Sequence, residues 1–199
     1  LRCGDSLLGV TSLEQVRHFH LDPDRGRALR AEHPLFDPIK AIDPLVERGL
    51  AVAHALGSID VVTLGDAERK RALQIEMAQA LDPLAVVGDV VVGAALAAAR
   101  PSEGDSTEDK LRSVVELLRT AFDDEAAQET RDNARATLRD AAGYWLDTDR
   151  PEGAIERQPL HWPLVFPEVF LAPGRLGFDV LVGNPPFLGG TRISGSYGS

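Results

Sequence analysis

LAVVGDVVVGAALAAA, residues 84–99, stands near the middle of this 199-residue chain, and only Gly88, Asp89 and Gly93 interrupt its apolar side chains. A helix without a polar face has to be covered by neighbouring elements. The run therefore predicts the buried centre of a group of helices. The density of β-branched residues from Val86 to Val92 leaves a strand as the alternative.

Two helices are expected before this run. Asp43 precedes Pro44, which is a typical helix start with proline at the first helical position, and Gly57 ends the apolar periodicity that follows. A second helix is expected to begin at Asp66 and to stop near Asp82-Pro83, because proline disfavours a continuing helix. Residues 11–42 contain several prolines and predict a brief helix followed by an irregular connection.

Two further helices are expected after the run. Ser106 with Asp109 resembles a capping box, and apolar residues recur at helical spacing as far as Phe122. Residues 124–146 are mostly charged or alanine until Tyr144-Trp145. This pattern predicts an exposed helix that aromatic side chains anchor at one end.

The composition is that of a globular protein with an acidic balance. The chain has 31 acidic and 21 basic residues, a formal net charge of −10. Because an acidic segment repels phosphate backbones, any nucleic-acid affinity is expected to come mainly from regions outside this chain. The lone Cys3 excludes an internal disulfide and a zinc site built from paired cysteines, and His18 with His20 has no third metal ligand at a convincing spacing. We expect a cytoplasmic protein without a resident metal or a membrane partner.

The C-terminal region differs from the helical middle. Residues 150–177 contain five prolines and the aromatic group His161, Trp162, Phe166 and Phe170, which predicts an extended segment packed on a surface. Phe178 to Val182 then has the pattern of a short buried strand that ends at Gly183.

This expected strand leads into Asn184-Pro185-Pro186-Phe187. The two prolines stiffen the loop and leave its carbonyl groups free to accept hydrogen bonds. Asn184 adds a side-chain carbonyl and Phe187 a flat apolar ring, so the loop has the groups needed to hold a planar base with an exocyclic amino group. Acceptors that grip the amino hydrogens can aim the nitrogen lone pair at a methyl donor. A base in a duplex must first be flipped out of the stack.

The tetrapeptide resembles the catalytic motif of amino-methylating methyltransferases that use S-adenosyl-L-methionine. Residues 161–170 and 187–190 resemble large adenine-specific DNA methyltransferases of the type IIG restriction-modification kind. The resemblance implies that Asn184 and Pro185 hold the adenine amino group, that Pro186 shapes the loop and that Phe187 stacks on the base.

Residues 1–8, LRCGDSLL, resemble the acidic motif of the same family. The resemblance implies that Asp5 accepts a hydrogen bond from the adenine of the cofactor. Some relatives follow this aspartate with an aromatic residue that covers the cofactor ring, a role that Ser6 does not fill.

The resemblance implies an α/β fold class, a Rossmann-like methyltransferase core with a large, mainly helical insertion, in which this chain is mostly α. The core would comprise residues 1–10 and 150–199, and the insertion residues 11–149. We expect an internal fragment that is inactive alone and binds the cofactor more weakly than micromolar. The function implied is adenine N6 methylation of double-stranded DNA in restriction-modification or phage defence.

Other interpretations of the motif stay open. The same tetrapeptide serves enzymes that methylate glutamine side chains in proteins or amino groups in RNA, and a truncated chain could be a non-catalytic helical interaction module. The purely structural interpretation is a rigid turn after a buried strand for residues 184–187, and a solvated strand-end or turn aspartate for Asp5.

Overall fold

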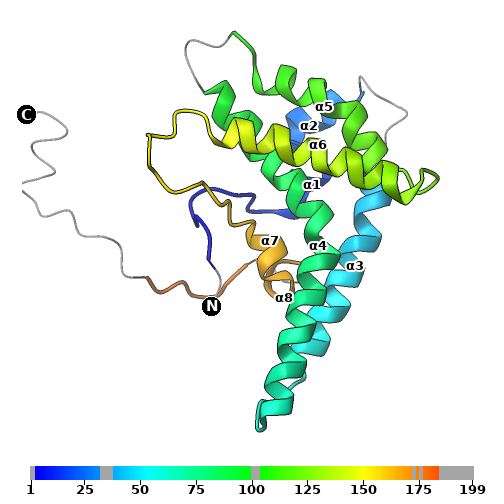
Figure 1. Cartoon of the computed structure of the whole chain (residues 1–199), viewed down its shortest axis with the longest axis vertical. Helices are drawn as coiled ribbons and strands as arrows, with labels where there is room; N and C mark the ends of the chain where they lie inside the picture. Colours follow the sequence, from blue (N-terminus) through cyan, green and yellow to red (C-terminus); the bar gives the residue numbers. More distant parts are fainter. Residues whose placement is uncertain (1–2, 32–37, 100–103, 172–173, 175–176, 184–199) are drawn as a thin grey trace, which may run out of the picture.

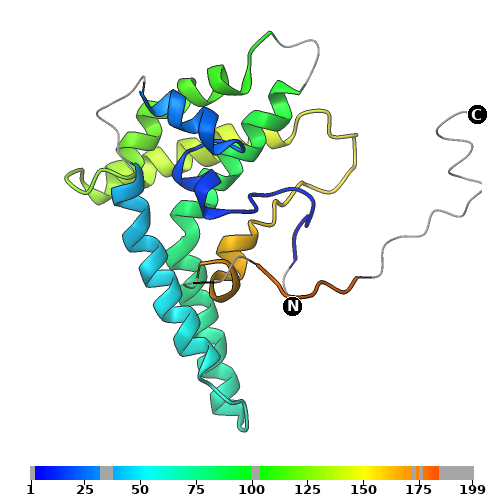
Figure 2. The same cartoon turned by 180° about the vertical axis from the view of Figure 1, so that it is seen from behind.

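The computed structural model describes residues 3–31, 38–99, 104–171, 174 and 177–183, and within them the chain is mostly helical. In the described part the helices are α1 (Leu13–Arg17), α2 (Pro23–Ala31), α3 (Pro38–Gly57), α4 (Leu64–Ala98), α5 (Thr107–Ala121), α6 (Gln128–Leu146), α7 (Trp162–Val165) and α8 (Pro167–Phe170). Figure 1 shows α4 along the centre of the molecule, with α3 beside one half of it and α5 and α6 at the other. Figure 2 shows α1 and α2 from behind.

The core is built around α4. Val87, Val90, Val91 and Ala94 are fully buried, and the helix packs mainly against α6 and α3. The predicted buried central helix is therefore confirmed, and a strand at residues 86–92 is wrong. By length and composition α4 could also cross a membrane, but 67% of its most apolar window is buried inside the protein, as in the core helix of a globular domain.

Two of the predicted helix boundaries are wrong at prolines. The helix expected to begin at Pro44 begins at Pro38, and α4 continues through Pro83 to Ala98. An internal proline costs a helix about 3 kcal/mol. Burial of a leucine contributes about 1.5–3 kcal/mol, and Leu81 and Leu84 on either side of Pro83 are 3% and 0% exposed. Packing at this point is sufficient to hold the helix together.

The helices after the apolar run agree more closely with prediction. The capping box at the start of α5 is confirmed, since the Asp109 amide donates to Ser106 Oγ at 3.1 Å and the Ser106 amide donates to Asp109 Oδ2 at 3.0 Å. Hydrogen bonds from the Ser106 hydroxyl and backbone amide lower the pKa of Asp109. At the end of α6, Trp145 is buried but Tyr144 is 77% exposed, so only the tryptophan anchors the helix.

The expected α/β class is contradicted, because the described residues form helices and no sheet. One isolated parallel bridge, between Asp5 and Pro159, occurs in this part of the chain. The prediction of a buried strand at Phe178–Val182 is also wrong. Val180, Leu181 and Val182 are 76%, 70% and 91% exposed and belong to no ladder. The apolar pattern favours an extended backbone, but a strand is stable only beside another strand, and the helices offer none.

Candidate functional site

The catalytic residues predicted from sequence, Asn184, Pro185, Pro186 and Phe187, lie outside the described residues. The segment that leads into them, 177–183, is described and mostly exposed. The geometry of the candidate site therefore rests on Asp5 and on the aromatic region that precedes this segment.

Asp5 lies beside a segment that is remote in sequence. Its backbone amide donates to the Gln158 carbonyl at 2.7 Å, and the Leu160 amide donates to the Asp5 carbonyl at 3.2 Å. Leu160 also donates to the Leu8 carbonyl at 2.7 Å. These bonds hold the first residues of the chain against the start of the aromatic region.

The Asp5 side chain is exposed, and one of its oxygens accepts a hydrogen bond from the Leu7 amide at 3.0 Å. No ion pair to this carboxylate is found among the described residues. Since an ionised carboxylate offers about four acceptor positions, Asp5 keeps the capacity to accept hydrogen bonds from a ligand.

The rings of Trp162, Phe166, Phe170 and Phe178 form one group, here called the aromatic cluster. Phe178 packs edge-on against the other three, with ring centroids 5.3 Å from Phe166 and Phe170 and 5.7 Å from Trp162. The cluster is fixed to the N-terminal segment because the Trp162 indole nitrogen donates to the Ser6 carbonyl at 3.2 Å. Packing of this region on a surface was predicted, but residues 162–165 and 167–170 are short helices rather than extended chain.

His161 connects this region to the core. It is 4% exposed, its Nδ1 accepts from the Val10 amide at 3.2 Å, and its Nε2 lies 3.0 Å from Asp89 Oδ1. Because Nδ1 is the acceptor, the neutral ring carries its hydrogen on Nε2 and donates it to Asp89. Sequence reasoning missed this pair. The available signal was the polar Asp89 beside Gly88 within an apolar run, since a buried polar group requires a partner.

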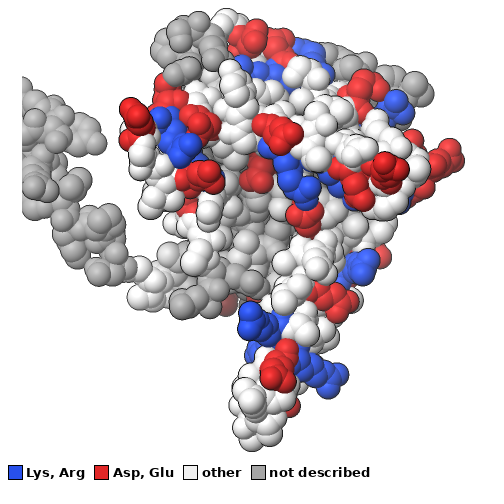
Figure 3. All heavy atoms as spheres, in the orientation of Figure 1, with Lys and Arg blue, Asp and Glu red and all other residues white. Residues whose placement is uncertain are grey.

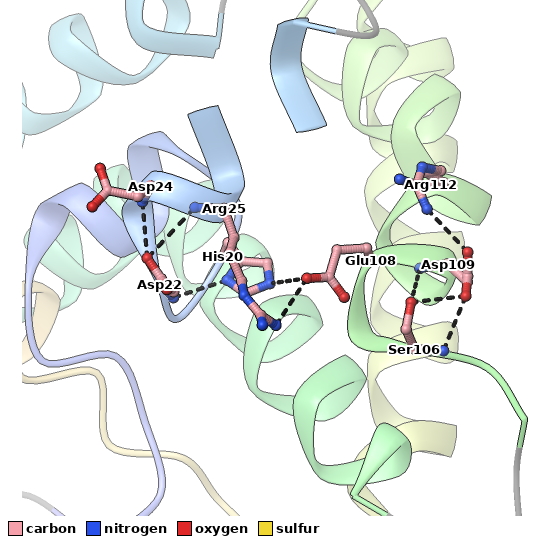
Figure 4. Close-up of polar contacts among 8 residues, drawn as sticks. All are labelled: His20, Asp22, Asp24, Arg25, Ser106, Glu108, Asp109 and Arg112. Carbon is pink, nitrogen blue, oxygen red and sulfur yellow. Dashed lines mark hydrogen bonds and ion pairs between the residues drawn. The ribbon is translucent and has the colours of Figure 1, made fainter. Parts of the chain in front are cut away.

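His20 belongs to a second polar cluster, which it forms with Asp22, Arg25 and Glu108. His20 accepts from the Asp22 amide at 2.8 Å through Nδ1, and its Nε2 lies 3.5 Å from Glu108, which also pairs with Arg25 at 3.1 Å (Figure 4). These contacts join the α1–α2 connection to the start of α5. In the part of the chain that is described, no group of three or more His, Cys, Asp or Glu residues is arranged to hold a metal ion.

Acidic and basic side chains are interspersed on the face shown in Figure 3. Many arginines are paired with carboxylates, as Arg17 is with Asp43 and Arg119 with Glu116. The run Arg69-Lys70-Arg71 on α4 has no such pair among the residues described, although Lys70 donates to the Ile59 carbonyl at 3.4 Å. The run is short and is flanked by Asp66 and Glu68, so it does not form a large basic surface.

No protein-family model, curated protein or solved structure matches the chain. Its function is therefore inferred from its own residues.

Proposed function

We propose that the chain takes part in methyl transfer from S-adenosyl-L-methionine to the N6 amino group of adenine in DNA. One observation supports this proposal beyond the motif itself. The backbone of Asp5 is hydrogen-bonded to Gln158 and Leu160, and the Ser6 carbonyl accepts from the Trp162 indole. The Trp162 ring packs against Phe178, in the segment leading to Asn184. Residues 1–8 and 161–170, which resemble the same family, are thus in contact, although Ser6 and Trp162 are separated by 156 positions in sequence.

The proposed chemistry assigns a separate task to each residue of the loop. The Asn184 side-chain carbonyl and the Pro185 carbonyl accept the two amino hydrogens of adenine and orient the nitrogen lone pair. Phe187 stacks on the flipped base, which offsets part of the roughly few kcal/mol needed to unstack it. Pro186 restricts the backbone so that the two acceptors converge.

The cofactor supplies an activated methyl group. The residues present fit its adenine end, because the Asp5 carboxylate is exposed and has acceptor positions beyond the one that the Leu7 amide occupies. The described helices supply no sheet, so the proposal rests on the motif and on the contacts of Asp5 and Ser6, not on the fold. Binding of the DNA backbone is assigned mainly to regions outside this chain, in keeping with its net charge of −10.

The helical architecture favours one alternative, a non-catalytic helical interaction module. Such a module would need neither Asn184 nor a methyl donor. Methylation of RNA amino groups or protein glutamine, which the same tetrapeptide serves, differs only in the acceptor.

The test is transfer of labelled methyl groups from S-adenosyl-L-methionine by the protein as its gene encodes it. DNA, RNA and protein are offered as acceptors, with wild type compared with Asn184→Ala. We expect label in DNA and a loss of about 100-fold in the variant, the scale observed when one stabilising hydrogen-bond partner is removed from an active site. Asn133→Ala, on the exposed surface of α6, is the matched control. Label in RNA or protein, or an equal rate in Asn184→Ala, would refute the assignment.

A further inference from the structure

The hairpin formed by α3 and α4 ends in residues 58–71, here called the hairpin tip, which project away from the other helices (Figure 1, Figure 2). α3 ends at Gly57, and Lys70 donates to the Ile59 carbonyl at 3.4 Å, so the loop after α3 lies beside the second turn of α4. The first two turns of α4 therefore extend past α3 by about 10 Å, at roughly 1.5 Å per residue. At its end the hairpin narrows from two packed helices to one helix and a loop.

Apolar side chains occupy the outer end of the tip. Val61, Val62 and Leu64 are 53%, 85% and 77% exposed. Single exposed apolar side chains are common, but a contiguous apolar patch bordered by polar residues marks an interaction surface. The start of α4 is held by a capping box, in which the Asp66 amide donates to Thr63 Oγ1 at 3.2 Å. The exposed apolar residues therefore stand on a fixed backbone.

The basic residues of the hairpin differ from those of the other described elements. Most described arginines outside the hairpin are paired with carboxylates, whereas none of the five basic residues of α3 and α4 has a carboxylate within ion-pair distance among the residues described: Lys40, Arg48, Arg69, Lys70 and Arg71. Lys70 is half-buried and the other four are exposed. Figure 3 shows basic side chains on both sides of the projecting end of the hairpin. In a chain with a formal net charge of −10, these unpaired cations favour an anionic partner at this end.

We propose that the hairpin tip binds in the major groove of double-stranded DNA, with Arg69, Lys70 and Arg71 on backbone phosphates and Val62 and Leu64 against thymine methyl groups. This inference rests on the proposed function and adds a DNA contact that is separate from the residues of methyl transfer. One helix is about 10–12 Å across, which matches a groove about 12 Å wide. The thymine methyl group is the apolar feature that this groove presents.

The sequence of the tip favours DNA over a lipid bilayer. A helix that lies on a membrane needs an apolar face along its length, but residues 65–71 contain no apolar side chain larger than alanine. Asp66 and Glu68 in the same turns limit the electrostatic contact to about two or three phosphates. The tip therefore adds a local contact, while most phosphate-binding charge remains assigned to regions outside this chain.

The test is binding of the 199-residue chain to a fluorescein-labelled DNA duplex rich in A·T pairs, followed by fluorescence anisotropy at a series of salt concentrations. The double variant Arg69→Gln with Arg71→Gln is expected to lower the slope of log affinity against log salt by about two, since each phosphate contact contributes about 0.9. Arg112→Gln with Arg119→Gln is the matched control, because these arginines are exposed on α5 and paired with carboxylates. The control should leave the slope unchanged.

A base analogue tests the apolar contact separately. Uracil lacks the methyl group of thymine, so a duplex with uracil at every thymine position is expected to bind about fourfold more weakly, which corresponds to roughly 0.8 kcal/mol for one buried methyl group. The double variant Val62→Ala with Leu64→Ala should bind both duplexes equally and keep the salt dependence of wild type. Ile155→Ala, at a position that is 90% exposed outside the tip, should keep the preference for thymine. Circular dichroism verifies that all variants retain their helices.

Failure of wild type to bind the duplex at low ionic strength, equal effects of the two arginine variants, or equal affinity for the two duplexes would overturn the inference. Tighter binding to a structured RNA or to phosphatidylglycerol vesicles would assign the tip to that partner and would also overturn it. The outcome is separable from the proposed function. DNA binding by the tip can be measured in a protein that transfers no methyl group, and methyl transfer to DNA with no effect of the tip variants on binding would refute only the inference.

Discussion

His161 donates a hydrogen bond from Nε2 to Asp89 Oδ1 at 3.0 Å, across 72 residues of sequence. The other ring nitrogen accepts from the Val10 amide, so one imidazole joins the N-terminal segment, the aromatic region and α4. The residues on either side of His161 contact the N-terminal segment, since Leu160 donates to the Asp5 carbonyl and Trp162 donates to the Ser6 carbonyl. The placement of the candidate site on the helical core therefore depends on this side chain.

Replacement of His161 is expected to be strongly destabilising. His161→Ala leaves the Val10 amide without its acceptor and opens a cavity beside α4, which together should lower the free energy of unfolding by about 2–4 kcal/mol. Asp89→Asn is the conservative control, because its side-chain carbonyl still accepts from Nε2, and should cost under about 1 kcal/mol. Urea unfolding of both variants measures this difference. Equal stability of His161→Ala and wild type would show that the pair does not hold the segments together.

Gly88→Ala is expected to disrupt the His161–Asp89 pair from the α4 side. A Cβ at residue 88 would lie 2.6 Å from Cε1 of the His161 ring, which is too close for any packed contact. Forced displacement in a packed core costs about 1–3 kcal/mol. Gly143→Ala is the matched control, since nothing lies within 4 Å of its added Cβ, and it should stabilise α6 by up to about 1 kcal/mol. Thermal unfolding that shifts both variants in the same direction would contradict the geometry.

The N-terminal helices should lose stability as the pH falls. Burial, with contributions from Arg27 and Arg30, lowers the pKa of His18. The unfolded chain, with a histidine pKa of about 6.5, therefore takes up this proton first. The contribution of His18 is fully present above about pH 6.5 and declines as the pH falls towards the lower folded pKa. We expect His18→Gln to flatten the pH dependence of the unfolding free energy in this window, whereas His54→Gln, at an exposed position, should preserve it.

The capping box of α5 provides a test of local structure. Ser106→Ala removes the hydroxyl that accepts from the Asp109 amide at 3.1 Å, and should lower the free energy of unfolding by about 1 kcal/mol. Ser113→Ala serves as a control inside the same helix, because the Ser113 hydroxyl donates at 2.6 Å to the Lys110 carbonyl rather than accepting from an amide at the start of the helix. Chemical denaturation that ranks Ser113→Ala as the more damaging change would contradict this role for Ser106.

Short-range signals in the sequence predicted the helical part of the fold. The apolar run around Val90 and the Ser106–Asp109 box each depend on neighbouring residues, and both are found in the structure. Pro44 and Pro83 were misread as boundaries, because the packing that outweighs a missing hydrogen bond comes from residues distant in sequence.

Long-range pairing could not be predicted in the same way. Nothing in the sequence near Asp89 specifies His161 as its partner, and nothing near Ser6 specifies Trp162. The predicted strand at Phe178–Val182 failed for a related reason, since its apolar pattern defines a preference for extended backbone but not a neighbouring strand. The roles of Asn184 to Phe187 rest on their chemistry and on the resemblance of the motif.

The most direct measurement of the central claim is the content of N6-methyldeoxyadenosine in DNA from cells that express the gene encoding this chain. Wild type, Asn184→Ala and Asn133→Ala are compared by chromatography and mass spectrometry, with equal protein levels verified. The account predicts the modified nucleoside with wild type and Asn133→Ala, and a decrease of about 100-fold with Asn184→Ala. Absence of the nucleoside with wild type, or an unchanged level with Asn184→Ala, would contradict it.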